Sequence, residues 1–264
     1  MRYFDAHCHI QFDPYDADRG AVLGRMREAG VGGVVVGVDY PSSEAALALV
    51  RGEETLQASV GLHPNHDGEI FDMDKYRALA RDSSVVALGE CGLDYYRPED
   101  ATEAKPRQRV LFEQHIELAV ELDKPLIIHA RPSKGTMDAY HDLIAILASK
   151  KREYGERLRG DIHFFVGGID EARSLIELGF TLSYTAVLTF ARDYDETVRY
   201  APLTSILTET DSPYVAPASR RGTRNDPLAV VDVVQAIAGI RGEEEEEVRV
   251  QVLQNAGRVF GFAG

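Results

Sequence analysis

The stretch QRVLFEQHIELAVELDKPLIIHAR, residues 108–131, contains one step from a helix to a strand. Within residues 108–123 apolar side chains recur every three or four positions, which is the period of an amphipathic helix. Pro125 follows that pattern as a stop signal, and the apolar run Leu126–His129 after it predicts a buried strand. A helix followed by a short buried strand is the unit from which parallel sheets are built.

The same alternation runs along the rest of the chain. Short apolar, β-branched runs are separated by longer amphipathic segments, such as residues 171–179, several of which end in Gly or precede Pro. Eight strand–helix units in 264 residues predict an α/β fold, a single (β/α)8 TIM barrel, with residues 1–264 forming one domain. The expected strands are Tyr3–Ala6, Val34–Val38, Gln57–Gly61, Val85–Gly89, Leu126–His129, Asp161–Phe164, Thr181–Ser183 and Ile206–Glu209.

Composition narrows the classes of protein to which the chain can belong. The net charge of −14 argues against a tight, non-specific nucleic-acid binder, but it allows a nuclease whose positive charge is local or supplied by metal ions. No stretch approaches the ~20 apolar residues of a membrane span, and the N-terminus lacks the pattern of a secretory signal. The two cysteines, Cys8 and Cys91, are too few for a disulfide framework, which fits a reducing compartment. Together these features lead us to expect a cytoplasmic location with no membrane contact.

Chemically reactive side chains gather at the carboxyl ends of the expected strands, where TIM barrels hold their active sites. His7 and His9 close the first strand, and the alternation of a strand points both to one face while it turns Cys8 away. Buried imidazoles and carboxylates are costly unless they are paired or bound to metal, so this grouping predicts a metal centre. The other side chains placed in this way are His63, Glu90, Asp94, His129, Arg131, His163 and Asp211.

Four imidazoles and two carboxylates suit a hydrolytic centre with two divalent metal ions. Asp211 is expected to join the histidines of the first strand at one ion and to act as general base, while Glu90 bridges to a second ion held by the histidines of the fifth and sixth strands. Imidazole-rich ligands favour Zn²⁺, Ni²⁺ or Mn²⁺, so Mg²⁺ is expected only as a weakly bound activator. The expected ligands are His7, His9, Glu90, His129, His163 and Asp211.

The remaining histidines and one acidic residue receive other interpretations. His115 and His141 lie in helical segments and are expected at the surface or in helix packing. His66 lies in a loop, and its role stays open. Asp5 is interpreted either as a partner that orients the histidines or as a capping residue.

Short motifs recur at the ends of these strands: FDAHCH (4–9), GLHP (61–64), GECGLDYYR (89–97), PLIIHAR (125–131), HFFVGG (163–168), LTETDSPY (207–214), RGTRNDP (221–227) and NAGRVFG (255–261). In this order they resemble the TatD-like metal-dependent deoxyribonucleases, a branch of the amidohydrolase superfamily. The resemblance implies a TIM barrel that holds divalent ions and cleaves phosphodiester bonds of DNA, often from the 3′ end. It places that family's metal ligands on the same six residues as above.

The resemblance also implies contacts to the substrate. His63 corresponds to a histidine expected to contact phosphate, and Asp94 and Arg97 to residues near the substrate. Arginine suits bidentate phosphate contacts, so further candidates are Arg131, Arg221, Arg224 and Asn225. Since an acidic surface slows association with long polyanions, we expect DNA with single-stranded 3′ ends to be the favoured partner, and no stable protein partner.

Two segments leave the substrate preference open. HARPSKGT (129–136) and HFFVGG (163–168) depart from the sequences usual in that family, beside expected ligands. Residues 99–108, EDATEAKPRQ, are expected to form a flexible lid-type loop.

Two other functions stay open at this point. An ester or amide hydrolase, such as a D-aminoacyl-tRNA deacylase, would use the same centre. Many amidohydrolases carry a carboxylated lysine at the fourth strand, and Glu90 in its place favours the TatD-like branch without separating a phosphate from an acyl substrate. A binding protein on a barrel that has lost its activity is disfavoured, because all six expected ligands are present.

Overall fold

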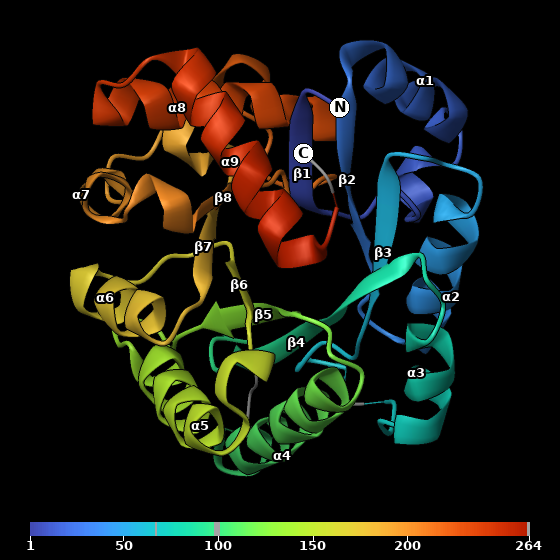
Figure 1. Ribbon diagram of the computed structural model, residues 1–264, viewed down its shortest axis with the longest axis vertical. Coiled ribbons are helices and arrows are strands. Elements are labelled where there is room, and N and C mark those ends of the chain that lie inside the picture. Colours follow the sequence, from blue (N-terminus) through green and yellow to red (C-terminus); the bar gives the residue numbers. More distant parts are fainter. Residues whose placement is uncertain (67, 98–100, 263–264) are drawn as a thin grey trace.

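The computed structural model describes residues 1–66, 68–97 and 101–262. In these ranges eight parallel strands, hydrogen-bonded in chain order, curve into a nearly closed barrel with helices around it (Figure 1). The expected (β/α)8 TIM barrel is therefore confirmed. None of the helices in this part of the chain is long and apolar enough to cross a membrane.

The strands and helices alternate along the chain. The strands are β1 (Tyr3–Cys8), β2 (Val31–Val36), β3 (Leu56–Val60), β4 (Val85–Asp94), β5 (Leu126–Arg131), β6 (Gly160–His163), β7 (Thr181–Tyr184) and β8 (Ile206–Thr208). The helices are α1 (Arg19–Ala29), α2 (Tyr40–Val50), α3 (Met73–Ala80), α4 (Ala101–Glu121), α5 (Asp138–Tyr154), α6 (Ile169–Glu177), α7 (Asp195–Tyr200), α8 (Val230–Arg241) and α9 (Glu245–Phe260).

The barrel closes where the segment after β8 meets β1. The backbone N–H of Asp211 donates to the carbonyl of His7 at 2.9 Å, and the N–H of His9 donates to the carbonyl of Ser212 at 2.8 Å. One consequence is that the two histidines of the first strand and the aspartate after the last strand lie side by side, although they are about 200 positions apart in the chain.

Helix α9 covers the amino-terminal end of the barrel, which lies opposite the end where the strands finish (Figure 1). Phe260 stacks on Phe4 with the ring centroids 5.8 Å apart. Asn255 donates to the carbonyls of Leu203 and Ile206, at the start of β8. The residues that fill this end are Phe4, Ala6, Val34, Val36, Ala87, Ile127, Leu207, Leu253, Ala256 and Phe260.

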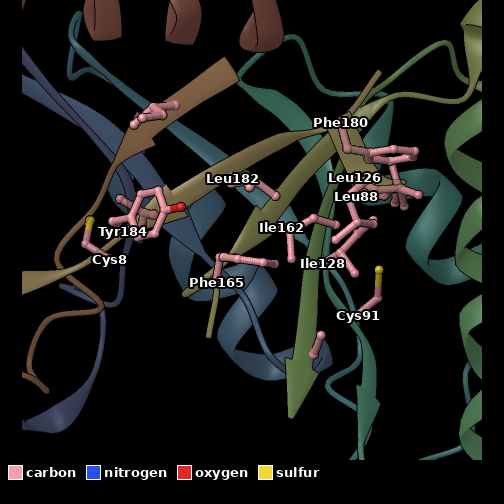
Figure 2. Packing of buried hydrophobic residues seen from close by; sticks show 14 of the residues in the cluster. Cys8, Leu88, Cys91, Leu126, Ile128, Ile162, Phe165, Phe180, Leu182 and Tyr184 are labelled. Atoms are coloured by element: carbon pink, nitrogen blue, oxygen red, sulfur yellow. The ribbon is translucent and has the colours of Figure 1, made fainter. Parts of the chain in front are cut away.

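A second buried layer lies between the strands and the surrounding helices. Figure 2 shows part of it, including Leu88, Ile128 and Leu182. Cys8 and Cys91 lie in this layer as free, buried cysteines, and burial raises the pKa of each thiol well above its ordinary value. The expectation that Cys8 faces away from His7 and His9 is therefore confirmed.

The expected end of the fourth strand is wrong. β4 does not stop at Gly89 but continues to Asp94, pairing Gly92 with His129 of β5. Gly92 has a φ of 132°, and a Cβ at this position would lie 2.1 Å from the carbonyl oxygen of His129. The two strands can approach this closely only because the residue is glycine.

The expected lid-type loop over residues 99–108 is also wrong from residue 101 onward, because residues 101–108 form the first turns of α4; residues 99 and 100 lie outside the described residues. Gln108 is buried and fastens this helix to the end of β4. Its side chain accepts a hydrogen bond from the N–H of Asp94 at 2.8 Å and donates to the carbonyl of the same residue at 2.9 Å. These contacts hold the helix against the end of β4.

Replacing Phe260 by Ala should lower the free energy of unfolding by about 3–5 kcal/mol, because it leaves a cavity in the buried end of the barrel. The Phe260 side chain is 4% exposed, whereas Val250 on the same helix is 37% exposed. Urea unfolding followed by circular dichroism measures the difference. Val250→Ala is the matched control and should change stability by less than about 1 kcal/mol. Equal midpoints for Phe260→Ala and the wild type would contradict this role of α9.

Candidate active site

Glu90 lies in β4 at the centre of the barrel mouth, where two glycines let the strand approach its neighbour. Gly89 has a φ of 143°, and a Cβ there would lie 2.4 Å from the carbonyl oxygen of Ile127 in β5. Gly92 approaches β5 in the same way. The glycines of GECGLD therefore serve to bring the Glu90 carboxylate against the side chains at the end of β5.

Imidazoles from four different parts of the barrel surround the Glu90 carboxylate. His129 Nδ1 lies 2.9 Å from Oε1, and His7 Nε2 lies 3.4 Å from Oε2. His63 Nε2 and His163 Nε2 lie 3.5 Å and 3.9 Å from Oε1. The structure thus brings Glu90 together with three of the four expected histidine ligands and with His63.

Asp211 forms a second focus beside the first. His9 Nε2 lies 3.5 Å from Asp211 Oδ1, His7 Nε2 lies 4.0 Å from the same oxygen, and the two Nε2 atoms are 3.1 Å apart. Asp211 has a φ of 51°, in the left-handed region that is uncommon for residues other than glycine. Such backbone conformations cluster at functional sites.

The donor atoms fit divalent metal ions. Two ligands about 2.1 Å from a tetrahedral ion are separated by about 3.4 Å, which is close to the separations within this cluster. Imidazole nitrogens and carboxylate oxygens are ligands that Zn²⁺ and other transition metals accept. Within the described residues, three groups have all their candidate ligand atoms within 4.8 Å of one another: His7, His9 and Asp211; His7, Glu90 and His163; His63, Asp94 and His129.

The composition of these groups differs from the expected one in one respect. From the sequence, His129 and His163 are expected to hold the second ion together. In the structure, the candidate ligand atoms of His163 lie close to those of His7 and Glu90 instead. His129 touches Glu90 through Nδ1 and lies 3.2 Å from Asp94 Oδ2 through Nε2. It therefore sits between the Glu90 carboxylate and the carboxylate at the end of β4.

The protonation states of Glu90, Asp211 and His63 suit metal binding. Burial would raise the pKa of Glu90, but the facing His63 and His7 outweigh burial and hold this pKa well below its ordinary value. Burial would likewise raise the pKa of Asp211, and the hydrogen bond and charges of the neighbouring histidines lower it. Burial lowers the pKa of His63 to about 3. At neutral pH both carboxylates are ionised and His63 is neutral.

Two histidines are oriented by contacts on their other ring nitrogen. His9 Nδ1 lies 2.8 Å from the carbonyl oxygen of Val36 and donates a hydrogen bond to it. In the neutral imidazole the other nitrogen, Nε2, then carries a free lone pair. His163 Nδ1 lies 3.0 Å from Oε1 of the fully buried Glu209. Metal-binding histidines are commonly held by such partners.

Glu209 is a residue in contact with this cluster that sequence reasoning missed. Burial would lower the pKa of His163, but the charges of Glu209 and Glu90 raise it to about 10. Glu209 also accepts hydrogen bonds from the backbone N–H of Phe164 and from Ser183 Oγ, both at 2.7 Å. Its position in LTETDSPY, two residues before the expected ligand Asp211, is the feature of the sequence that could have pointed to it.

Asp5 lies beneath the ligand cluster and contacts the backbone of the segments that carry it. It accepts hydrogen bonds from the backbone N–H of His7 at 3.1 Å and of Thr210 at 2.9 Å, and from the Thr210 hydroxyl at 2.5 Å. The side chain is fully buried. These contacts connect β1 to the segment after β8, which favours the interpretation of Asp5 as an orienting partner.

The three remaining histidines, His66, His115 and His141, differ in how far they are buried. His115 is buried and accepts a hydrogen bond from the N–H of Leu62 at 3.0 Å, so its expected role in helix packing is confirmed. His141 is a surface residue of α5, as expected, and its ring also lines the cavity above the ligand cluster. His66 lines the same cavity and lies 3.7 Å from Asp39.

A cavity of about 1350 Å³ opens above the ligand cluster. His9, His63, Glu90, His129, His163 and Asp211 lie at its floor or walls. Within the described residues, its cationic lining side chains other than histidine are Arg97, Arg131 and Lys134, and its aromatic ones are Phe12, Tyr96, Phe164, Tyr194 and Tyr214. The sequence reasoning missed these aromatic side chains, although Tyr96 and Tyr214 stand inside the motifs GLDYYR and ETDSPY.

Four of the expected substrate contacts lie at this cavity or beside it. His63, Arg97 and Arg131 line it, and the Arg131 guanidinium lies 4.1 Å from the centre of the Tyr96 ring. Asp94 is buried, and Arg97 Nε lies 3.9 Å from its carboxylate.

The other three expected contacts lie outside the cavity lining. Arg224 forms a two-pronged ion pair with Asp18, both hydrogen bonds being 2.7 Å long. Asn225 is buried and donates to the carbonyls of Thr210 and Val215. Arg221 lies 3.9 Å above the ring of Phe190. In the structure these side chains contact neighbouring parts of the protein.

Comparison with known proteins agrees with this description. Residues 4–261 match the family model described as TatD related DNase. The chain is 35% identical to the Escherichia coli (strain K12) protein named uncharacterized metal-dependent hydrolase YcfH, over 98% of this chain and 96% of that protein. It is 30% identical to the Pantoea vagans protein named 3′-5′ ssDNA/RNA exonuclease TatD, over 98% of this chain and all of that one (100%).

A solved structure gives the same result. The crystal structure of YjjV, a TatD homologue from Escherichia coli K12, superposes with a TM-score of 0.88 over 99% of both chains, at 27% sequence identity. The match covers the barrel and the elements that carry the ligand cluster. The chain therefore belongs to the family of TatD-related DNases and is a metal-dependent hydrolase.

Proposed function

We propose that this protein is a deoxyribonuclease that removes nucleotides from the 3′ end of single-stranded DNA with the aid of two divalent metal ions. The observation that carries the proposal is the cluster around Glu90, which lies under a cavity lined by cationic and aromatic side chains. Cationic groups suit the phosphates of a nucleic-acid strand and aromatic rings suit its bases. The name of the Pantoea vagans relative supports the same direction of cleavage.

In this proposal two ions would be held by His7, His9, Glu90, His129, His163 and Asp211. Bound ions would supply Lewis-acid activation of the attacking water and of the phosphodiester. The ionised Asp211 carboxylate accepts the proton of that water as general base. His63, Arg97 and Arg131, which line the cavity above, orient the phosphate.

One alternative is an ester or amide hydrolase, of which a D-aminoacyl-tRNA deacylase is an example. The net charge of −14 supports the members of this class that act on small esters or amides, because a strongly acidic protein repels a long polyanion such as DNA or tRNA. The cationic side chains around the cavity favour the nuclease. A protein that leaves DNA intact with every metal would move the proposal to this alternative.

Asp211→Asn should abolish cleavage. A general base contributes about 100-fold or more to the rate, and this variant also loses a charged ligand. A 5′-labelled single-stranded oligonucleotide, incubated with Mn²⁺, Mg²⁺ or EDTA, should give a metal-dependent ladder that shortens from the 3′ end with the wild type only. Asp193→Asn, on the exposed loop before α7, is the matched control and should retain the ladder. A ladder of normal intensity from Asp211→Asn would contradict the role given to this residue.

Protein purified without chelators or metal-affinity steps should contain a tightly bound transition metal rather than Mg²⁺, because imidazoles dominate the ligands. Elemental analysis by mass spectrometry measures the content directly. EDTA should lower the melting temperature, and the same transition metal should restore it, since ligand binding stabilises the folded state. The absence of any transition metal above trace level would show the expectation to be wrong.

Linear single-stranded DNA should be degraded faster than circular duplex plasmid at the same nucleotide concentration. A single strand can enter the cavity by its end, while the acidic surface repels the high charge density of the duplex. Release of acid-soluble nucleotides from the two substrates gives the ratio of rates. Equal rates would exclude the preference for free single-stranded ends.

A further inference from the structure

The two sides of the cavity differ in chemistry. We define the aromatic rim as Phe12 and Tyr214, which follow β1 and β8. We define the cationic rim as Tyr96 and Arg97, which follow β4, together with Arg131, the last residue of β5, and Lys134, which follows that strand. In a barrel whose strands are hydrogen-bonded in the order β1 to β8, the ends of β1 and β8 lie across the mouth from those of β4 and β5 (Figure 1). The cluster around Glu90 and Asp211 lies between the two rims.

The aromatic rim presents rings beside the ligand cluster. Phe12 stacks on the ring of His9 with the centroids 4.6 Å apart and the planes only 4° from parallel. Tyr214 lies 6.4 Å from the same imidazole and is 54% exposed. Among the described lining residues, the cationic side chains other than histidine all lie on the other side of the mouth.

The cationic rim presents one ring together with charges. Tyr96 is 52% exposed, and the guanidinium of Arg131 lies 4.1 Å from the centre of its ring. Arg97 and Lys134 line the same side of the cavity. An aromatic ring beside several cations is the combination that binds a nucleic-acid strand along its backbone.

The difference between the aromatic rim and the cationic rim determines which end of a nucleic-acid strand fits on each side of the cluster. In removal of a terminal nucleotide, the leaving side contributes one base and no phosphate beyond the bond that is cleaved. The retained strand carries one phosphate for every nucleotide, so counter-charges are needed on its side. We infer that the 3′-terminal base stacks on the aromatic rim and that the retained strand runs over the cationic rim; this inference rests on the proposed nuclease function.

The experiment follows release of the first nucleotide from three 5′-labelled oligonucleotides: an unmodified one, one with a tetrahydrofuran abasic unit at the 3′ terminus, and one with that unit two positions inside. It compares the wild type with Tyr214→Ala, Tyr96→Ala and the control Tyr200→Ala. Tyr200 is 39% exposed and lies outside the cavity lining, where Arg173 packs against its ring. All three tyrosines are partly exposed, so the fold should tolerate their replacement.

Tyr214→Ala should lower kcat/KM about tenfold on the unmodified strand and cause no loss when the terminal base is missing, as expected for one lost base stack. Tyr96→Ala should show the opposite dependence, with its loss disappearing when the inner base is missing. Tyr200→Ala should match the wild type on all three substrates. Losses that do not depend on the position of the missing base would overturn the inference. If the wild type leaves the unmodified strand intact, the proposed function itself is wrong and the inference falls with it.

Discussion

The Glu90 carboxylate, buried among imidazoles at the mouth of the barrel, is the constraint on which the rest of the site depends. A buried charge costs several kcal/mol unless partners compensate for it, so the side chains around it cannot be chosen freely. His129, His7, His63 and His163 meet this requirement within 2.9–3.9 Å. The same arrangement leaves several electron-rich donor atoms facing one another, which is what a pair of divalent ions would neutralise.

The remainder of the barrel holds these donors in place. The backbone hydrogen bonds between the segment after β8 and β1 set Asp211 beside His9. Asp5 and Glu209 lie one layer below and fix the orientation of what they touch, through the backbone of His7 and the ring of His163. Helix α9 closes the opposite end of the barrel, so the packing that stabilises the fold is separate from the side chains that carry the chemistry.

The two sides of the cavity differ in chemistry, which the ligand cluster alone does not show, and this difference bears on the direction in which a strand would lie. Its cationic side chains come from the segment after β4 and from the end of β5 and the segment after it, and its rings nearest His9 come from the segments after β1 and β8. The polarity proposed for a bound strand follows from the order of the strands around the barrel. Hydrolysis, by contrast, depends on the cluster of candidate metal ligands at the centre of the barrel mouth.

Much of this site could be read from the sequence, because in a parallel barrel every strand delivers its last residues to the same end. His7 and Asp211 needed only to stand near the ends of β1 and β8 to be brought together, and His9, the residue after β1, lies beside His7. Local pattern did not reveal that β4 continues to Asp94. That extension depends on close pairing with β5, which becomes visible only when both strands are in place.

The sequence by itself determined the alternation of strands and helices and the identity of the groups at the mouth, because both follow from local periodicity. Only the tertiary structure decided which of these groups touch. Arg224 and Asn225 stand in a motif that suggests phosphate, yet Arg224 pairs with Asp18, 206 positions away, and Asn225 binds the backbone of its own loop. The contacts of such side chains depend on which distant segment the fold brings beside them, and a local pattern carries no record of that neighbour.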